Sequence, residues 1–423
     1  MDAIARHGRS ANRIASPKRQ ARKHANAATR IRAAKESVER RVAEVTRYVP
    51  VPVQCMLWGK AAGRCEFTGC NQPLWKSRVT QEQVNIGQKA HIYAFSGGGA
   101  RGHNGADLIT LQDLSNLMLV CHGCHRKIDK RLDGGRYTVS VLQQMKAMHE
   151  GRIELVSAIA AEKSSHVLLY GANIGDHSSP LNYAEAAAAL FPDRYPAADR
   201  AIELSVHNSS FNERDEEFWR NESLELRRKF DRLVRAHAAE GGIRHLSVFA
   251  LAPQPLLILL GSLLGDIVPC DVYQRHREPM TWAWPGEGEA GAFRMRRPDQ
   301  SEGPAALVFG VSGSVSSDRI QRVLGKSANI WCIDVATPHN DFVKSRRQTA
   351  AFRCLVRTTL EQIKAVHGHG ETLHIFPAMP VSLAVELGRV RMPKADMPWV
   401  VYDEVNSRGG FVRALSIPEG GLE

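Results

Sequence analysis

Four cysteines are gathered in one part of the chain with spacings typical of a metal site. Cys65 and Cys70 form a Cys-x4-Cys pair, and Cys121 and Cys124 form a Cys-x-x-Cys pair. Two such pairs can place four thiolates around one Zn²⁺ ion in a closed, tetrahedral site. Because zinc bound in this way ties two loops together, the spacing predicts a structural zinc site in a small domain.

A second set of residues near these cysteines has the composition of a hydrolytic site. His125 and Asp129 are four residues apart, so on a helix both side chains lie on one face and can hold one divalent cation. Mg²⁺, Mn²⁺ or Ni²⁺ would suit such a pair. His91, in the apolar stretch KAHIYAF, is a candidate general base, and Asn116 can orient that imidazole or its loop. Phosphodiester cleavage needs a base and a cation, so these residues favour a nuclease.

Each of these residues also has a plainer structural interpretation. A lone histidine on an apolar strand is more often a satisfied core residue, and structural zinc does not imply catalysis. The remaining cysteines are isolated, and we expect them to be small buried side chains; they are Cys55, Cys270, Cys332 and Cys354.

Short elements must position the candidate site within residues 49–155. Apolar pieces at Cys65–Phe67 and Ala90–Phe95 are separated by turn residues, and a helical run follows Cys121. The glycine-rich stretch Ser96–Gly105 lacks the Gly-Lys-Ser/Thr ending of a phosphate-binding loop, so we reject that interpretation. A helical pattern then leads to a linker at 156–165.

Residues 166–423 have a different pattern, in which apolar strands alternate with helices. The order β-α-β-α-β-α-β occurs once over about 166–300 and again over about 304–423, which predicts α/β architecture in two Rossmann-like halves. One large doubly wound sheet is the alternative. The predicted strands are 166–171, 202–206, 246–250, 270–273, 306–311, 330–335, 372–376 and 399–402.

The charge of the chain is unevenly distributed. The 423 residues carry a formal net charge of +12, and residues 1–50 hold 13 Lys and Arg against 4 Asp and Glu. A basic N-terminal arm, residues 1–48, with a helix in its second part, suggests contact with nucleic acid. A transit peptide or an extension without a role are alternatives. Neither a signal peptide nor an apolar run of membrane-spanning length is present, so we expect a cytoplasmic protein without a membrane partner.

Residues 51–150 resemble an HNH endonuclease domain of the α+β, ββα-metal type, on the motifs CEFTGC, KAHI and LSNLMLVCHGCHRKID. The resemblance implies that His91 is the general base, Asn116 the structural middle residue and His125 a metal ligand. Many family members have Asp or His directly before the base, where this chain has Ala90. The catalytic cation would therefore depend on His125, Asp129, water and phosphate.

Residues 166–423 resemble the SAVED domain, a fusion of two CARF-like Rossmann halves found in antiphage CBASS systems. The segments LAPQPL, HIFPAMP, YQRH with WAW, and VVYD carry this resemblance. It implies an HNH–SAVED effector that degrades double-stranded DNA after a cyclic oligonucleotide binds SAVED and drives homo-oligomerisation. The activator would be a second messenger, a cyclic dinucleotide, made by a cognate nucleotidyltransferase.

Ligands of open α/β sheets bind at the carboxyl ends of strands, near helix N-termini. The corresponding loops of both halves are therefore expected to form the pocket, and two halves suit a ligand with two nucleotide units. Backbone N–H groups at 312–314 and at the helix starts after Pro255 and Pro380 would meet phosphates. The candidate ligand-binding residues are Pro253, Gln254, Tyr273, Arg275, Trp284, Ser312, Gly313, Lys344, Arg346, Pro377, Met379 and Tyr402.

Two other functions stay open at this point. A constitutive, restriction-like HNH nuclease would cut DNA without a nucleotide activator. A zinc-stabilised DNA-binding regulator with a nucleotide-sensing domain would not cut DNA, and the Ala90 departure is its best support.

Overall fold

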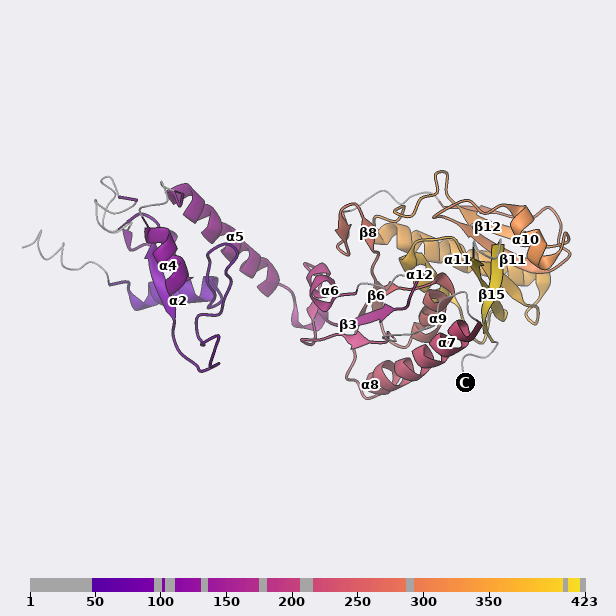
Figure 1. The fold of residues 1–423 in the computed structure, drawn as a ribbon, viewed down its shortest axis with the longest axis horizontal. Helices are drawn as coiled ribbons and strands as arrows, with labels where there is room; N and C mark the ends of the chain where they lie inside the picture. The colour runs from indigo at the N-terminus through magenta and orange to yellow at the C-terminus, as the bar shows by residue number, and fades with distance from the viewer. Residues whose placement is uncertain are drawn as a thin grey trace, which may run out of the picture. The chain divides into compact units, whose positions relative to one another are not determined.

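The computed structural model describes residues 48–94, 101–102, 111–130, 136–174, 181–205, 216–286, 293–405 and 410–418. The chain divides into two compact units, of which the first ends at Ala158 and the second begins at Ile159 (Figure 1). The predicted basic arm, apart from Tyr48, lies outside the described residues. Within the described part of the chain, no helix is both long and apolar enough to cross a membrane.

The first unit contains a two-stranded antiparallel sheet followed directly by a helix. Its helices and strands are α2 (Val51–Lys60), β1 (Gly87–His91), η1 (Leu114–Asn116), β2 (Leu117–Cys121), α4 (His122–Asp129) and α5 (Val139–Ser157). The register places Gly87 opposite Cys121 and His91 opposite Leu117. All of β2 is buried, because α2 and α4 both pack against it.

Local sequence determines where the helices of the first unit begin. Pro50 precedes α2 and Pro52 lies in its first turn, where the missing N–H has no helical partner to lose. Thr138 caps α5, since its hydroxyl accepts a hydrogen bond from the Val141 N–H (3.3 Å). Cys121 caps α4 in the same way, through its sulfur.

The first half of the second unit is built on a five-stranded sheet. Its elements are η3 (Ala161–Lys163), β3 (Ser164–Gly171), α6 (Tyr183–Ala189), β4 (Tyr195–Pro196), β5 (Ile202–Glu203), α7 (Glu216–Phe230), the π-helical η4 (Asp231–Arg235), α8 (Ala236–Ala239), β6 (Leu246–Leu251), α9 (Gln254–Leu264), β7 (Cys270–Val272), β8 (His276–Arg277) and β9 (Met280–Thr281). Strand β3 pairs in parallel with β6 and with both β4 and β5, and β6 pairs in parallel with β7. Strands β8 and β9 form a separate antiparallel hairpin.

The second half is built on a six-stranded sheet in the order β10-β12-β11-β13-β14-β15. Its elements are β10 (Arg294–Arg296), β11 (Ala305–Gly310), α10 (Ser317–Leu324), β12 (Asn329–Asp334), α11 (Arg346–His367), β13 (Leu373–Phe376), α12 (Val381–Val390), β14 (Trp399–Val405) and β15 (Gly410–Ile417). The four central strands are parallel, and the two edge strands, β10 and β15, are antiparallel to their neighbours.

The two halves repeat one topology. In each, the first strand lies between the second and the third, and the fourth pairs with the third: β5-β3-β6-β7 and β12-β11-β13-β14. The alternative of a single large sheet is therefore wrong, because the described strands of the halves form separate sheets. The predicted parallel order is confirmed for these strands, whereas the antiparallel edges of the second sheet were not predicted.

A group of three aromatic rings supports the sheet of the first half. Tyr273 stacks on Phe249, with ring centroids 4.4 Å apart and planes 19° apart. Trp282 meets Phe249 edge-on at 5.3 Å and 87°. The Arg275 guanidinium lies 5.3 Å from the centroid of the Trp282 ring.

The second half repeats this group. Tyr402 stacks on Phe376 at 4.4 Å and 11°, and Phe411 meets Phe376 edge-on at 5.2 Å and 82°. Arg319 lies 4.8 Å from the Phe411 centroid. The stacked pairs occupy equivalent places on the third and fourth strands of each half, which supports a duplicated origin, whereas the edge-on ring and the cation come from different elements in the two halves.

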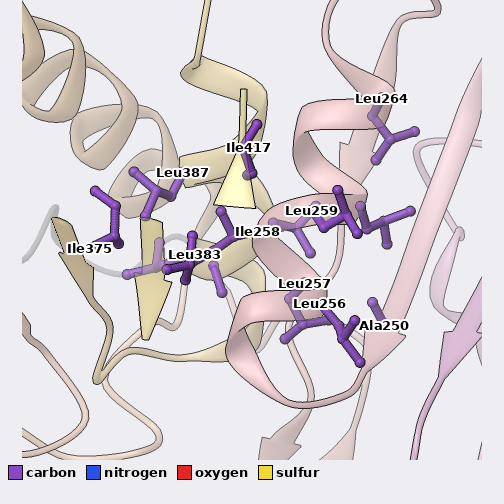
Figure 2. Close-up of a cluster of buried hydrophobic side chains, with 14 of the residues drawn as sticks. Ala250, Leu256, Leu257, Ile258, Leu259, Leu264, Ile375, Leu383, Leu387 and Ile417 are labelled. Atoms are coloured by element: carbon purple, nitrogen blue, oxygen red, sulfur yellow. The ribbon is translucent and has the colours of Figure 1, made fainter. Parts of the chain in front are cut away.

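Helices α9 and α12 join the halves through the shared hydrophobic core (Figure 2). They cross at two glycines. A Cβ atom on Gly261 would lie 1.9 Å from the Val385 carbonyl oxygen, and one on Gly388 would lie 2.0 Å from the Ile258 carbonyl oxygen. The backbones thus touch where side chains normally separate helices, so the two halves pack as one body.

Candidate functional site

The four cysteines predicted as zinc ligands lie together in the first unit. Their Sγ atoms are all within 4.8 Å of one another, and those of Cys70 and Cys121 are 4.0 Å apart. Four sulfurs bound to Zn²⁺ at about 2.3 Å in a tetrahedron lie about 3.8 Å apart, so the spacing fits a closed four-cysteine site. Within the residues that the structure describes, this is the single group of three or more such side chains that could hold a metal ion.

The surroundings of the cysteines also fit a cation. Burial raises the pKa of the Cys65 thiol to about 12, so this thiol loses its proton near neutral pH only beside a compensating positive charge. Burial acts to raise the pKa of Cys121 as well. The Cys121 sulfur accepts hydrogen bonds, however, first of all from the Cys124 N–H (3.4 Å), and these bonds outweigh burial, so the pKa of Cys121 is lowered. Cys65 accepts a similar bond from the Cys121 N–H (3.3 Å).

The loop that carries the first cysteine pair is attached to β2. Gly69 supplies a residue with positive φ (82°), which allows the tight turn between the two cysteines. The Glu66 backbone N–H donates to the Leu119 carbonyl (2.9 Å), and the Glu66 carboxylate accepts from the Leu119 N–H. Burial raises the pKa of Glu66 to about 7, although the Lys146 ammonium 3.8 Å away acts to lower it.

The predicted base and the predicted middle residue lie at the same end of the strand pair. His91 is the last residue of β1 and pairs with Leu117 of β2, and Asn116 directly precedes Leu117. His125 lies in α4, which follows β2 without an intervening loop. Strands β1 and β2 thus place His91 and Asn116 at one end of the small sheet, whereas α4, which carries His125, starts at the other end, after Cys121.

Asn116 holds the backbone that follows the predicted base. Its side chain is buried, and its Oδ1 accepts a hydrogen bond from the Tyr93 N–H (2.7 Å). Its Nδ2 donates to the carbonyls of Leu111 (3.0 Å) and Tyr93 (3.3 Å). The Ile92 N–H donates to the Asn116 carbonyl (2.8 Å). The amide therefore orients the chain beside His91.

His125 and Asp129 form a pair one helical turn apart. The His125 Nδ1 is 3.3 Å from the Asp129 Oδ2. The other carboxylate oxygen, Oδ1, accepts a hydrogen bond from Arg101 (3.3 Å). The sequence-based reasoning missed Arg101, because it lies within the glycine-rich stretch Ser96–Gly105, which shows no apolar periodicity.

Ala90, the departure from the HNH pattern, faces the core of the first unit. Its side chain is buried, as is that of Ile92, whereas the intervening His91 is half-buried. Since side chains alternate along a strand, position 90 points away from the face that carries His91. A small apolar side chain therefore suits position 90 in this fold.

Two of the aromatic residues predicted to contact a ligand lie in the cores of the second unit. Tyr273 is 1% exposed and Tyr402 is 6% exposed, and each stacks on a phenylalanine of the neighbouring strand. The Trp284 ring is half-buried, with its centroid 6.5 Å from that of Tyr273. The structure thus places the two tyrosine rings beneath the strand ends rather than on an open surface.

The predicted ligand-binding cations are all ion-paired. The pairs are Arg275 with Glu185, Lys344 with Asp341, and Arg346 with Asp193. Arg346, from the second half, also donates to the Tyr273 hydroxyl of the first half (3.2 Å). These cations therefore already have carboxylate partners that a phosphate would have to replace.

Two predicted ligand loops of the second half contact each other. The Ser312 N–H donates to the Ala378 carbonyl (2.8 Å). Gly313 follows Ser312, and the buried Pro377 and Met379 flank Ala378. The first of the backbone N–H groups expected to meet phosphate is therefore already bonded within the fold.

Two glutamines of the first half reach the start of α12. Gln254, next to the N-cap Pro253, accepts a hydrogen bond from the Met379 N–H (3.2 Å) through its Oε1. The Oε1 of Gln274 accepts from both the N–H (3.1 Å) and the hydroxyl (2.8 Å) of Ser382. An N–H in the first turn of α12 thus binds a glutamine amide where phosphate was predicted.

Buried nitrogen atoms without a hydrogen-bond partner lie near the carboxyl end of β7. Both ring nitrogens of His276, the Trp284 Nε1 and the Arg346 Nε have no hydrogen-bond partner among the described residues. Burial lowers the pKa of His276, although Asp341, with Oδ1 3.4 Å from the His276 Nδ1, acts to raise it. The Trp284 and Arg346 nitrogens are donors, whereas a neutral imidazole offers one donor and one acceptor. The two unpaired donors favour a guest with hydrogen-bond acceptors at this position.

A cavity of about 1170 Å³ lies at the C-terminal ends of α9 and α12. Ser262, Arg389 and Lys394 are among its lining residues, and none of the predicted ligand-binding residues is. Arg357, another lining residue, is ion-paired with the buried Asp396. The cavity is thus separate from the predicted ligand loops, which lie at the other end of both helices.

Residues 226–417 match the family model of the SMODS-associated and fused to various effectors sensor domain, SAVED. This matched segment lies within the mixed α/β second unit and is similar to SAVED sensor domains. No curated protein matches the chain.

Solved receptors with SAVED/CARF domains have a distantly similar structure. The Acinetobacter baumannii Cap4 receptor with the cyclic trinucleotide 2′3′3′-cAAA is 12% identical, with a TM-score of 0.40, over 66% of this chain and 55% of that chain. The same receptor described without a ligand is 11% identical, with a TM-score of 0.39, over 74% and 63%. The Moraxella osloensis Cap4 receptor is 12% identical, with a TM-score of 0.37, over 66% and 60%. The chain spans less than two thirds of these proteins.

Proposed function

We propose that the chain is a metal-dependent HNH endonuclease that cleaves double-stranded DNA when its SAVED domain binds a cyclic oligonucleotide, in antiphage defence. One observation carries the nuclease half: β1 and β2 place His91 next to Asn116, and Arg101 bonds both to the His91 carbonyl and to Asp129 of the His125–Asp129 pair. The four-cysteine cluster lies in the same unit. A structural Zn²⁺ on the cysteines would hold the loop of Cys65 and Cys70 against the junction of β2 and α4.

Each residue then has a defined role. His91 removes a proton from the attacking water, because an imidazole is a base near neutral pH. Asn116 holds the chain beside His91 through Tyr93 and Leu111. His125 and Asp129 would hold the divalent cation, which when bound supplies positive charge at the scissile phosphate and the leaving oxygen.

The sensor half rests on the SAVED match and on the site near the end of β7. Unsatisfied donors on Trp284 and Arg346 suit the phosphate and carbonyl oxygens of a cyclic di- or trinucleotide. Arg346 connects the two halves through Asp193 and Tyr273, so a ligand that takes this cation changes how the halves are linked. Homo-oligomerisation is the proposed response.

A plasmid-cleavage assay tests this function. The full chain is incubated with supercoiled plasmid, with Mg²⁺, Mn²⁺ or Ni²⁺ in turn, and with each member of a panel of cyclic di- and trinucleotides. We expect cleavage only where a cation and one cyclic nucleotide are both present, and light scattering should then report a larger assembly. His91→Ala should lower the rate by about 10²- to 10⁴-fold. His122→Ala, which removes an exposed histidine of α4, should retain the rate.

The same assay separates the rival functions. Cleavage that is equal with and without cyclic nucleotides would select a constitutive, restriction-like nuclease. DNA binding without cleavage under any combination would select a zinc-stabilised regulator.

A further inference from the structure

Arg101 lies between two segments that carry residues of the proposed nuclease site. Its Nε donates to the Ile92 carbonyl (2.8 Å), and its Nη2 donates to the His91 carbonyl (3.3 Å). Its Nη1 donates to the Ile128 carbonyl (2.7 Å), and its Nη2 also reaches the Asp129 Oδ1 (3.3 Å). One guanidinium therefore joins the end of β1 to the end of α4.

The chemistry of these contacts is specific to arginine. A guanidinium presents five N–H groups in one plane, whereas a lysine ammonium has three on a single atom and cannot span four acceptors on two elements. The carbonyls at the C-terminus of α4 carry partial negative charge, which favours a cation there. The backbone of Arg101 is itself anchored, since its carbonyl accepts from the Ala94 N–H (2.8 Å).

The contact with Asp129 decides which carboxylate oxygen is available. Arg101 holds Oδ1, and Oδ2 then faces the His125 Nδ1 at 3.3 Å. Two ligand atoms about 2.1 Å from one cation and at right angles lie about 3 Å apart, so this pair fits neighbouring coordination positions. Without Arg101 the Asp129 side chain, which is 55% exposed, would lose its fixed orientation.

We propose that Arg101 is the positioning residue of the nuclease site. It orients the Asp129 carboxylate for the cation that Asp129 would share with His125, and it links that carboxylate to the backbone of His91. This inference rests on the proposed function of the first unit. A direct contact with DNA is the rival role for a cation here, but the Arg101 side chain is only 6% exposed.

The test compares Arg101→Gln and Arg101→Lys with the wild-type full chain. Calorimetric titration with Mn²⁺, without DNA, should show about tenfold weaker binding in both variants. In plasmid cleavage, with whichever member of the cyclic nucleotide panel activates the wild type, kcat should fall about 10- to 100-fold and KM for DNA should stay within about twofold. Arg126→Gln, which removes an exposed cation of α4, should leave Mn²⁺ binding and kcat unchanged.

Three results would overturn the inference. If the Arg101 variants bind Mn²⁺ as tightly as the wild type does, Arg101 does not orient Asp129 for the cation. A raised KM with unchanged kcat would make Arg101 a DNA contact. Activity lost only in proportion to the unfolded fraction, measured by circular dichroism, would make it a purely structural residue. If Arg101→Gln does not fold, Arg101→Lys, which keeps the charge, carries the same measurements.

The metal titration also separates this inference from the proposed function. A wild-type chain that binds Mn²⁺ but cuts no DNA under any condition would refute the nuclease assignment. The comparison of Mn²⁺ affinities between wild type and Arg101→Gln would still decide whether Arg101 orients Asp129.

Discussion

Substitution of Gly261 by alanine tests the contact between the two halves of the second unit most directly. The added Cβ would lie 1.9 Å from the Val385 carbonyl oxygen and 2.9 Å from the Gly388 Cα, and both atoms belong to backbone. Real Cβ atoms essentially never approach closer than 3.0 Å. Helices α9 and α12 must therefore move apart by about 1 Å, because no side-chain rotation can relieve the clash.

Two opposing effects set the size of the change. Overpacking of a core costs about 1–3 kcal/mol, and we take the upper end because nine buried residues of α9 move together. Alanine is favoured over glycine in a helix by about 1 kcal/mol. The free energy of unfolding of the second unit should therefore fall by about 2 kcal/mol, which corresponds to a loss of about 4–8 °C in Tm.

Differential scanning calorimetry of the full chain can measure this change. Gly151→Ala is the matched control, because Gly151 lies within α5 with no atom within 4 Å of the added Cβ. That control should leave the melting of the second unit unchanged. Gly388→Ala should resemble Gly261→Ala, and the double variant should lose less than the sum, since both methyl groups separate the same contact. A second unit that melts at or above the wild-type temperature in Gly261→Ala would refute the close crossing.

Three further predictions concern other parts of the chain. Burial lowers the pKa of His245 to about 4, so the unfolded imidazole binds a proton first as the pH falls. The free energy of unfolding should therefore drop by up to about 3 kcal/mol between pH 6.5 and 4. In urea titrations, His245→Gln should make the free energy of unfolding less dependent on pH. A pH dependence equal to that of the wild type would contradict this prediction. Cys121→Ser should lower the zinc content measured by mass spectrometry and the Tm of the first unit, and an unchanged zinc content would count against the four-cysteine site. Gln274→Leu leaves the Ser382 N–H and hydroxyl without their acceptor and should cost about 1–3 kcal/mol by the same urea titration, whereas wild-type stability would show that water replaces the glutamine.

The strands of the second unit could be predicted from the sequence because they are parallel and buried. All six residues of β11 are buried, and five of the six in β6, so each strand appears as a continuous apolar run between turns. The apolar run at 256–264 is likewise a buried helix, as predicted. Here burial on both faces produces a pattern strong enough to be recognised without tertiary information.

The edge strands could not be recognised in this way. Strand β10 consists of Arg294, Met295 and Arg296, and neither arginine is buried. It is held by contacts with β12, including the ion pair between Arg294 and Asp334 (3.0 Å). Strand β2 was also missed, because its residues were assigned only to the metal motif that follows them.

The isolated cysteines were partly misjudged for a related reason. Cys55 and Cys354 are exposed, and Cys270 and Cys332 are only half-buried, so the expectation of four buried cysteines was wrong. An isolated cysteine on a helix gives no sign of which face it occupies.

In the candidate site, too, contacts between residues close in sequence could be predicted, whereas contacts between distant residues could not. The cysteine spacing was sufficient for the four-sulfur cluster, because ligands on tight turns converge through local geometry. Arg101 and Gln274 act on residues far along the chain: Arg101 reaches Ile128 over 27 positions, and Gln274 reaches Ser382 over 108. No periodicity or spacing encodes such contacts.

The duplicated second unit has a consequence for how its two copies can change. Gln254 follows the proline that precedes α9, and the residue that follows the equivalent proline before α12 is Val381. In a symmetric dimer of one half, a mutation at this position would appear at both helix starts at once. Covalent fusion removes that constraint, so one copy can keep a polar side chain while the other keeps an apolar one. A fused pair can therefore evolve to bind an asymmetric ligand, one whose two ends differ. A symmetric dimer of identical subunits presents the same residues to both ends of its ligand.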